Sequence, residues 1–437
     1  MKKILKMTAA ALAAAVFLPV FTGCSFLRPI DGTEWEETTD IPRDTTRADE
    51  TKTPATTDGA SETAAPATTS APETTAPPAP KEKRASVLAV GDNIIHEAVY
   101  VDAKNRAVGE EYDFANMYAF VNDRIGAADV AFINHETPLA GDELGISGYP
   151  TFNAPRLAGR ALVSSSFDVV NLANNHIMDK RVSGARATVE YVRSLGLTDL
   201  GVYLDQEDYE NIRVTEANGI RIAWVAFSQD SNNPHDNKNS SVIFPRGDDD
   251  QVLINRIKAA DAISDFVIVS AHWGLEQPEL TSEQKRLAQV ITEAGADVIL
   301  GHHSHILQPV KWLSALDGSK TLVAYSLGNF LSAQLNGENM IGGMLTFDIV
   351  MNEDGECVLE NPVMEIVVNH YDGDWDTTQA YNVHRYNFQM YMLEDYTDAL
   401  AAKHGCRFFT DGFGMDWIDR HVRSIIDAEF LPASFDN

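Results

Sequence analysis

From residue 86 onward, short apolar runs alternate with longer segments in which apolar residues recur every three or four positions. Several short runs are rich in Val and Ile with little alternation, which is typical of strands covered on both faces. The predicted strands are 86–90, 130–134, 168–173, 221–228, 265–272, 297–301, 321–326, 344–350 and 363–369. The predicted helices are 113–127, 155–165, 183–195, 251–262 and 282–294. This alternation of strands and helices favours an α/β fold.

The last part of the chain has a different pattern. Residues 393–403 and 417–428 have the spacing of amphipathic helices. We therefore expect a main domain over 85–370 and a small helical extension over 371–437. The extension contains three histidines without a partner cluster, which we interpret as ordinary core or surface residues: His384, His404 and His421.

The N-terminal residues have the pattern of an export signal. Three lysines in the first six residues precede an apolar run, 7–21, that is too short for a comfortable membrane span. The run ends in Phe-Thr-Gly before Cys24, which resembles the lipobox of bacterial lipoproteins. That resemblance implies that 1–23 is a signal peptide and that Cys24 is lipidated, which would anchor the protein to the outer face of the cell membrane. The alternative is a plain signal peptide with an incidental cysteine.

Residues 24–84 are predicted to form a disordered tether. The stretch 53–80 contains 8 Thr, 8 Ala and 6 Pro, a composition that cannot bury a core. Such a tether suits a domain displayed at the cell surface, although a simple spacer has the same composition.

Charge and cysteine content narrow the possible functions. The chain has 34 Lys and Arg against 64 Asp and Glu, for a formal net charge of −30. This excess of acid argues against nucleic acid as a partner and against electrostatic docking to anionic lipid. Besides Cys24 the chain has Cys357 and Cys406, which either pair in an oxidising compartment or stay free thiols.

Chemically active side chains follow five of the predicted strands. In open α/β sheets, the carboxyl ends of strands face the ligand crevice, so we expect these residues to form one site. In chain order the five groups are Gly91-Asp92, Asn134-His135-Glu136, Asn174-Asn175-His176, His272-Trp273-Gly274 and Gly301-His302-His303-Ser304-His305.

Imidazole, carboxylate and amide oxygens together suit divalent Mn, Fe or Zn. A carboxylate can bridge two ions, and such a pair can polarise a carbonyl or phosphoryl oxygen and generate hydroxide near neutral pH. The cluster at 302–305 is the most specific signal, because neighbouring histidines are costly to charge together. Taken singly, Gly91-Asp92 is also explained as a turn, Asn174-Asn175-His176 as a loop cap, and His272 as a buried histidine that is simply hydrogen-bonded.

The ordered set resembles the calcineurin-like metallophosphoesterase superfamily, and more closely the CapA-type poly-γ-glutamate capsule synthesis proteins. The phrases that carry the resemblance are 89–92, 134–139, 172–176, 271–274, 301–305 and 325–330. The resemblance covers about residues 86–350. It implies a metallo-dependent phosphatase-like αββα sandwich.

Carried over residue by residue, the resemblance also implies roles. Asp92 and His305 would bind a first metal ion, and Glu136 would take the bridging position. A second ion would be bound by Asn175, His272 and His303. His176 would protonate a leaving group or steady an oxyanion, and Asp179 would orient its imidazole.

The sequence departs from the superfamily on the first strand, where Asp-x-His is usual. Here the histidine, His96, comes two residues late, so its role as a ligand stays open. We expect His135 and His302 to be rim residues and Asn329 to shape the rim of the pocket. Asn174 is expected to stabilise a turn, and the alternative is that Asn174 and Asn175 exchange roles.

Three functions fit these observations. The first is a surface-anchored protein of poly-γ-glutamate capsule biosynthesis with a dinuclear, hydrolase-type site, whose partners are the membrane, the polymer and the capsule machinery. The second is a metal-dependent phosphoesterase that acts on a cell-surface phosphoester. The third is a non-catalytic scaffold of a membrane assembly.

Overall fold

The computed structural model describes residues 82–233 and 241–436. The predicted signal peptide, the predicted lipidation site Cys24 and the predicted tether as far as residue 81 lie outside the described residues. The first strand, β1 (Lys83–Asn93), begins inside the stretch expected to be tether and is longer than the predicted 86–90. In the described ranges, no helix has the length and apolar character needed to cross a membrane.

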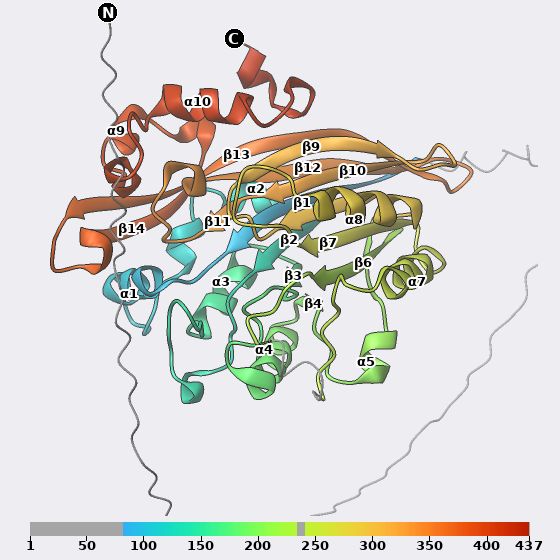
Figure 1. Cartoon of the computed structure of the whole chain (residues 1–437), viewed down its shortest axis with the longest axis horizontal. Helices are drawn as coiled ribbons and strands as arrows, with labels where there is room; N and C mark the ends of the chain where they lie inside the picture. The colour runs from blue at the N-terminus through green and yellow to red at the C-terminus, as the bar shows by residue number, and fades with distance from the viewer. Residues whose placement is uncertain (1–81, 234–240, 437) are drawn as a thin grey trace, which may run out of the picture. The chain divides into compact units, whose positions relative to one another are not determined.

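Two sheets form the centre of the described part of the chain (Figure 1). The first has eight strands among the described residues, in the order β14-β13-β12-β1-β2-β3-β4, with β11 also paired to β1. Strands β1 to β4 run parallel. The bounds that follow β1 are β2 Val130–His135, β3 Val169–Asn171, β4 Thr198–Leu200, β11 Asn329–Leu331, β12 Ile341–Met351, β13 Cys357–Trp375 and β14 Val383–Met392.

The second sheet has six strands within the same ranges, in the order β5-β6-β7-β8-β10-β9. Its central strands β6, β7, β8 and β10 are parallel, and β5 and β9 are antiparallel edge strands. Their bounds are β5 Arg213–Ala217, β6 Ile220–Ser228, β7 Phe266–His272, β8 Val298–His302, β9 Leu307–Ser314 and β10 Lys320–Leu327.

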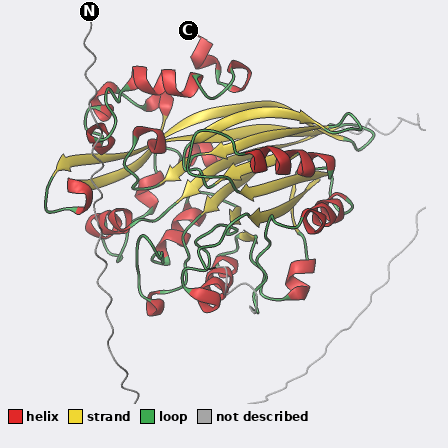
Figure 2. Ribbon diagram, viewed as in Figure 1, coloured by secondary structure: helices red, strands yellow, loops and turns green. Residues whose placement is uncertain are grey.

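Helices cover the outer faces of both sheets (Figure 2). The α-helices are α1 Glu97–Arg106, α2 Asn122–Gly126, α3 Leu157–Ser164, α4 Arg181–Ser194, α5 Gln206–Glu210, α7 Asp250–Asp261, α8 Ser282–Glu293, α9 Asp398–Ala401 and α10 Met415–Arg423. The short 3-10 helices are η1 Ala115–Tyr118, η2 Asp142–Leu144, η3 Gly337–Met340, η4 Ala380–Asn382, η5 Leu393–Asp395, η6 Gly405–Phe408, η7 Ala428–Phe430 and η8 Ala433–Asp436.

The hydrophobic core lies between the two sheets and under the helices. Val87 and Phe132 of the first sheet share one buried cluster with Trp224 and Ile268 of the second, and the rings of Phe132 and Trp224 stack. The other face of the second sheet packs against both α7 and α8, which supply Leu253, Ile257, Leu287 and Ile291 to a separate cluster. The predicted αββα sandwich is therefore confirmed.

Aspartates fix the edge of each sheet where the parallel strands begin. A carboxylate oxygen at the start of one strand accepts the backbone N–H of the neighbouring strand, at 2.7–2.8 Å in each case. The pairs are Asp129 with Ser86, Asp168 with Ala131, Asp265 with Arg221, and Asp297 with Val267. These bonds set the register of the strands whose other ends carry the candidate site.

Two expectations about the elements were wrong. The single helix expected over 113–127 is interrupted, since only η1 and α2 are helical there. The boundary expected at 370/371 lies inside β13, and β14 extends the first sheet, so apart from the short η4 between these strands the helical part begins at Leu393. Strand β14 has its period-two signal in the buried residues Phe388, Met390 and Met392.

The C-terminal helices pack beside β13 (Figure 1). Cys406 is buried in this region and Cys357 is half-buried, and both are free thiols. His404 is a core residue whose Nε2 lies 3.0 Å from the carbonyl oxygen of Asn369. The interpretation of His404 as a structural residue therefore agrees with its contacts.

Candidate metal centre

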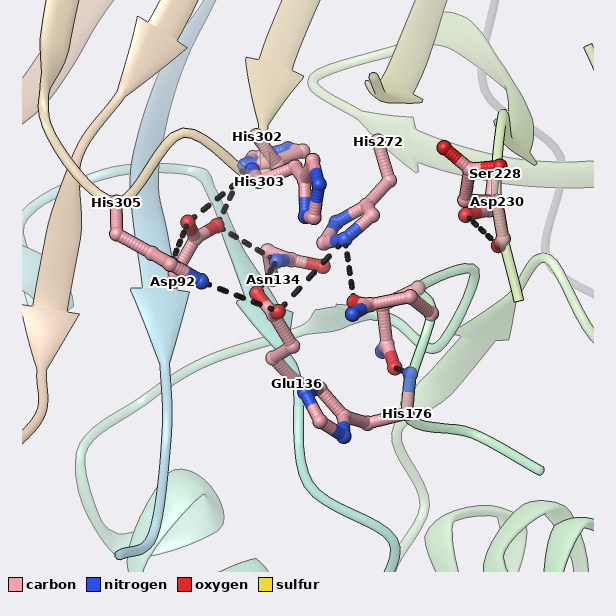
Figure 3. A network of polar contacts seen from close by, with 12 residues as sticks. Asp92, Asn134, Glu136, His176, Ser228, Asp230, His272, His302, His303 and His305 are labelled. Carbon is pink, nitrogen blue, oxygen red and sulfur yellow. Dashed lines mark hydrogen bonds and ion pairs between the residues drawn. The ribbon is translucent and has the colours of Figure 1, made fainter. Parts of the chain in front are cut away.

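The five predicted groups meet where the carboxyl ends of the two sets of parallel strands lie side by side (Figure 3). Asp92 stands near the end of β1 and Glu136 directly follows β2. His272 ends β7, and His303 and His305 lie in the turn between β8 and β9. Each sheet therefore supplies part of the cluster, as the strand-end rule predicts.

Asp92, Glu136 and His305 form one group that can hold a metal ion. One potential ligand atom of each lies within 4.8 Å of the others. His305 Nδ1 is 3.0 Å from Asp92 Oδ2, and His305 Nε2 is 3.7 Å from Glu136 Oε1. Both carboxylates are completely buried.

Glu136, His272 and His303 form a second such group. His272 Nε2 lies 3.7 Å from Glu136 Oε1 and 2.9 Å from Asn175 Oδ1, and the His272 and His303 rings are 4.7 Å apart. Glu136 thus belongs to both groups. Its Oε1 is approached by imidazoles from opposite sides (Figure 3).

The backbone around these ligands is tightly constrained. His303 and His305 have φ of 91° and 60°, in the left-handed region that non-glycine residues seldom adopt. Such conformations persist where surrounding structure enforces them, often at functional sites. Before Asp92, a Cβ at Gly91 would lie 1.9 Å from the carbonyl oxygen of Gly328, so only glycine fits there.

Burial and neighbouring charge shift the pKa values of the acidic ligands in opposite directions. Burial disfavours the charge on Asp92, yet the neighbouring imidazoles of His302 and His305 hold its pKa well below its ordinary value. For Glu136, burial dominates and, with the charge of Asp92, raises its pKa well above the ordinary value. Burial also opposes the charge on His305, but Glu136 and Asp92 raise its pKa to about 9.

The histidines of the second group are held neutral. Burial, together with the charge of His303, pushes the pKa of His272 well below its ordinary value. Burial and His305 lower the pKa of His303 to about 4. Neutral imidazoles are the form that binds metal ions.

The residues present fit a metal ion. Several buried polar atoms have no hydrogen-bond partner among the described residues, although such atoms are normally satisfied. They include Glu136 Oε1, His272 Nδ1 and His303 Nδ1. Carboxylate oxygens and imidazole nitrogens without partners, gathered in one buried place, are the donor set of a divalent transition metal.

Two hydrogen-bonded asparagines, Asn134 and Asn171, support the carboxylates of Asp92 and Glu136. Asn134 Nδ2 donates to Asp92 Oδ1 at 2.8 Å and to Glu136 Oε2 at 3.4 Å. Its Oδ1 accepts from Asn171 Nδ2 at 2.7 Å. Asn134 is completely buried, and sequence reasoning missed this orienting role because the residue was considered only as part of the motif.

His176 and Asp179 lie in contact, the arrangement that the family resemblance implied. His176 Nδ1 is 2.7 Å from Asp179 Oδ2 and 3.0 Å from Asn232 Nδ2. The same Asp179 oxygen accepts the backbone N–H of Phe152, whose ring meets the His176 ring edge-on. The imidazole is therefore fixed at Nδ1 while the side chain lines the cavity described below.

The expectation that His135 and His302 are rim residues was wrong, because both are completely buried. His135 Nδ1 lies 2.8 Å from Asn93 Nδ2, behind the ligands. His302 stacks on Phe132 with Nδ1 3.5 Å from Asp92 Oδ1. His135 ends β2 and His302 ends β8, and both strands are buried on both faces. Side chains on either face of these strands therefore do not reach the surface.

His96, Asn174 and Asn329 have separate roles. His96 lies outside both ligand groups, and its Nδ1 accepts the backbone N–H of Ala333. Asn174 stabilises a turn, since its Oδ1 accepts the N–H of His176. Asn329 donates to Gln334, which lines the cavity, so it supports the rim as expected.

A cavity of about 620 Å³ opens beside the cluster. His176 and His305 line it, together with Glu276, which sequence reasoning missed. Arg385 and Tyr381, from the C-terminal part, also line it. They are far from the motifs in sequence and carried no local signal.

The fold and the site define an α/β sandwich protein with a candidate metal centre at the carboxyl ends of its strands. More than half of the chain, residues 86–334, matches the family model described as "Bacterial capsule synthesis protein PGA_cap". The chain belongs to this family.

Two curated relatives agree with this assignment. The chain is 33% identical to "PGA biosynthesis protein CapA" of Bacillus subtilis over 40% of its own length and 45% of that protein. It is also 33% identical to "Capsule biosynthesis protein CapA" of Bacillus anthracis, over 40% of its length and 42% of that protein. The chain thus matches less than half the length of these relatives.

Among solved structures, the NAD nucleotidase of Haemophilus influenzae matches with a TM-score of 0.37 and 15% identity, over 66% of this chain and 52% of that one.

Proposed function

We propose that this protein handles poly-γ-glutamate in capsule biosynthesis, through a hydrolase-type centre that binds two divalent metal ions. The observation that carries the proposal is the sharing of Glu136 between two ligand groups, in a chain of the capsule synthesis family. The polymer is taken from the name of the Bacillus subtilis relative, a PGA biosynthesis protein, and the role in the capsule from the name of the Bacillus anthracis relative.

The ligand assignments follow the two groups. Asp92, Glu136 and His305 would hold one ion, and Glu136, Asn175, His272 and His303 the other. Mn, Fe and Zn suit this mixture of imidazole, carboxylate and amide. When bound, such a pair of ions supplies Lewis acidity for a carbonyl oxygen and a hydroxide near neutral pH.

The chain's own residues supply the remaining chemistry. Asp179 fixes the His176 ring through Nδ1, which leaves Nε2 for a substrate atom in the cavity. From that position His176 would give a proton to the leaving amine or a hydrogen bond to a developing oxyanion. Phe152 packs against the ring and restricts its motion.

The N-terminal sequence supports a location at the cell surface. The lipobox-like residues before Cys24 and the Thr/Ala/Pro-rich stretch are those of a lipid-anchored, displayed protein. In this proposal the membrane and the capsule machinery are the partners. The net charge of −30 repels an anionic polymer at long range, so the bound dications must offset it locally.

The test is turnover of the polymer by the full chain loaded with Mn²⁺. Mass spectrometry would follow the length of γ-linked polyglutamate with wild-type protein, with His176→Ala, and with His384→Ala, an exposed histidine on β14, as the matched control. We expect shortening or transfer with wild type and His384→Ala, and a loss of at least about 100-fold with His176→Ala. Unchanged polymer with the metal-loaded wild type would contradict hydrolysis of this substrate.

A phosphoester is the second candidate substrate. A carboxylate shared between two ligand groups also suits two ions that clamp the attacking and leaving oxygens of a phosphoryl transfer. A panel of aryl and glycerol phosphoesters would separate the two candidates. If neither substrate turned over and His176→Ala left capsule formation intact, a scaffold role would replace catalysis.

A further inference from the structure

The cavity beside the metal centre extends to a part of the chain outside the matched family region. One part of its lining is His176 and His305 of the candidate centre. Another part consists of Tyr381, Arg385 and Phe409, which lie beyond residue 334. A ligand that reaches the centre through this cavity therefore also contacts the C-terminal part.

Arg385 is a cation without a carboxylate partner. In the ranges 82–233 and 241–436, no ion pair includes Arg385. Its Nη1 donates to the carbonyl oxygen of Ala333, and its Nε is buried without a hydrogen-bond partner. By contrast, the half-buried Arg193 is held by Asp199 and Asp208 at 2.6–2.8 Å.

Burial lowers the pKa of the Arg385 guanidinium below its ordinary value, with partial compensation from nearby charges that include Glu97. A guanidinium stays protonated at any physiological pH despite such a shift. Burying an unpaired cation costs free energy, which a bound anion would recover. Arg385 therefore has the properties of a residue that binds an anionic ligand: it is charged, partly buried and without a carboxylate partner among the described residues.

Short contacts connect Arg385 to the candidate centre. The backbone of Ala333 accepts from Arg385 and donates to His96 Nδ1 at 3.2 Å. The His96 ring meets Phe152 edge-on at 5.3 Å, and Phe152 meets His176 at 4.6 Å. Because His96 Nδ1 is an acceptor, the neutral ring carries its proton on Nε2 and can donate to a ligand.

The loop before Arg385 shows backbone strain at the cavity. Tyr381 and Asn382 have φ of 60° and 59°, and Tyr381 is 61% exposed. The guanidinium carbon of Arg385 lies 5.6 Å from the centre of the Tyr381 ring. A strained residue that places an exposed aromatic ring over a cavity cation is a pattern found at ligand sites.

We propose that Arg385, with Tyr381 and His96, forms a subsite that binds a free carboxylate of the substrate while the neighbouring amide lies at the metal centre. This inference rests on the proposed function and makes it more specific. In a γ-linked glutamate chain every residue keeps its α-carboxylate, so a carboxylate recurs beside each amide. The planar guanidinium matches that group.

Other charges in the cavity make the subsite selective. Glu97, Glu276 and Glu338 also line the cavity and repel carboxylates. Arg385 is thus the position in the cavity where a carboxylate meets an unpaired cation. The repulsion elsewhere would fix the register of the polymer relative to the centre.

The test is calorimetric binding of γ-linked tetraglutamate to the Mn²⁺-loaded full chain, with mass spectrometry to measure how much of the oligomer is cleaved during the titration, so that the binding heat is assigned to the intact oligomer. The protein variants are wild type, Arg385→Gln, Arg385→Lys, and Arg420→Gln, an exposed arginine of α10, as the matched control. A second oligomer has every α-carboxylate converted to a carboxamide. Inorganic phosphate serves as a competitor.

We expect Arg385→Gln to weaken binding of tetraglutamate about tenfold or more, Arg385→Lys to weaken it less, and Arg420→Gln to leave it unchanged. Wild type should bind the carboxamide oligomer more weakly than tetraglutamate. For Arg385→Gln this difference in affinity between the two oligomers should be smaller, because the variant has already lost the contact with the carboxylate. The carboxamide comparison on wild type needs no substitution, so it stays decisive if a variant misfolds.

Three results would overturn the proposal. Equal affinity of wild type and Arg385→Gln would refute the subsite and leave the proposed function standing. Equal affinity for the carboxylate and carboxamide oligomers, with displacement by phosphate, would make this a phosphate site. Absence of tetraglutamate binding to metal-loaded wild type would contradict the proposed function, and the subsite with it.

Discussion

Asn134 gives the sharpest test of how the fold prepares the candidate centre. Its buried amide contacts Asp92 at 2.8 Å and Glu136 at 3.4 Å, one ligand from the first group and the ligand that both groups share. Asn134→Ala removes both contacts without removing a predicted ligand. The carboxylates then keep their positions only through their remaining partners.

The expected effect follows from these contacts. Loss of a residue that orients a metal ligand typically costs 10–100-fold in metal affinity, or about 1.4–2.8 kcal/mol. Because Asn134 touches Glu136, we expect both ions to bind more weakly. The metal-free protein should also lose about 1.5–3 kcal/mol of unfolding free energy, since a buried donor to a charged acceptor is removed.

Titration with Mn²⁺ or Zn²⁺ and a thermal melt of the metal-free protein measure the two effects. Asn369→Ala is the matched control, because Asn369 is equally buried but bonds to Ser332. It should lower stability and leave metal affinity unchanged. If Asn134→Ala binds both metals as tightly as wild type while Asn369→Ala behaves as described, the proposed orienting role is wrong.

Three further predictions concern protons and packing. Metal binding at pH 7 should release the proton of His305, because burial is outweighed by Glu136 and Asp92 and its pKa in the metal-free protein is about 9. Heats of binding that do not vary with the ionisation enthalpy of the buffer would contradict this. Burial raises the pKa of Asp297 from 3.8 to about 7, so the unfolded chain loses this proton first and stability should fall from pH 4 to pH 7 and then level off. Asp297 is partly exposed, so the unfolding free energy should fall by only about 1–2 kcal/mol over this range. In denaturant titrations, Asp297→Asn should abolish this pH dependence. An unchanged pH profile in the variant would refute the assignment to Asp297. Gly91→Ala should destabilise by about 3 kcal/mol or more, because its Cβ would meet the Gly328 carbonyl oxygen at 1.9 Å. Gly414→Ala, with nothing closer than 4.0 Å, should cost only about 0.5–1 kcal/mol, because alanine is a poorer N-cap of α10 than glycine.

The sequence predicted the central strands and the grouping at their ends well, for a physical reason. Strands such as β7 and β8 are buried on both faces, so their Val/Ile runs stand out from the surrounding pattern. Parallel strands bring their carboxyl ends to one edge, which is why residues as distant as Asp92 and His305 were expected together.

Other features depend on contacts that the sequence does not display. Strand β9 contains Pro309 and lies at an edge of its sheet, so its apolar pattern is weak. Helix α1 lacks a clear apolar stripe, and it was missed. Arg385 and Glu276 enter the cavity only through tertiary packing, and the burial of His135 and His302 depends on coverage of both sheet faces.

The central claim is that Glu136, Asn175, His272 and His303 hold one ion beside a second ion at Asp92, Glu136 and His305. Elemental analysis of the purified full chain, after loading with Mn²⁺ or Zn²⁺ and removal of free metal, tests it most directly. We predict about two equivalents in wild type, about one in His303→Ala, and unchanged content in His384→Ala. Little or no bound metal in the loaded wild type, or equal content in wild type and His303→Ala, would contradict the account.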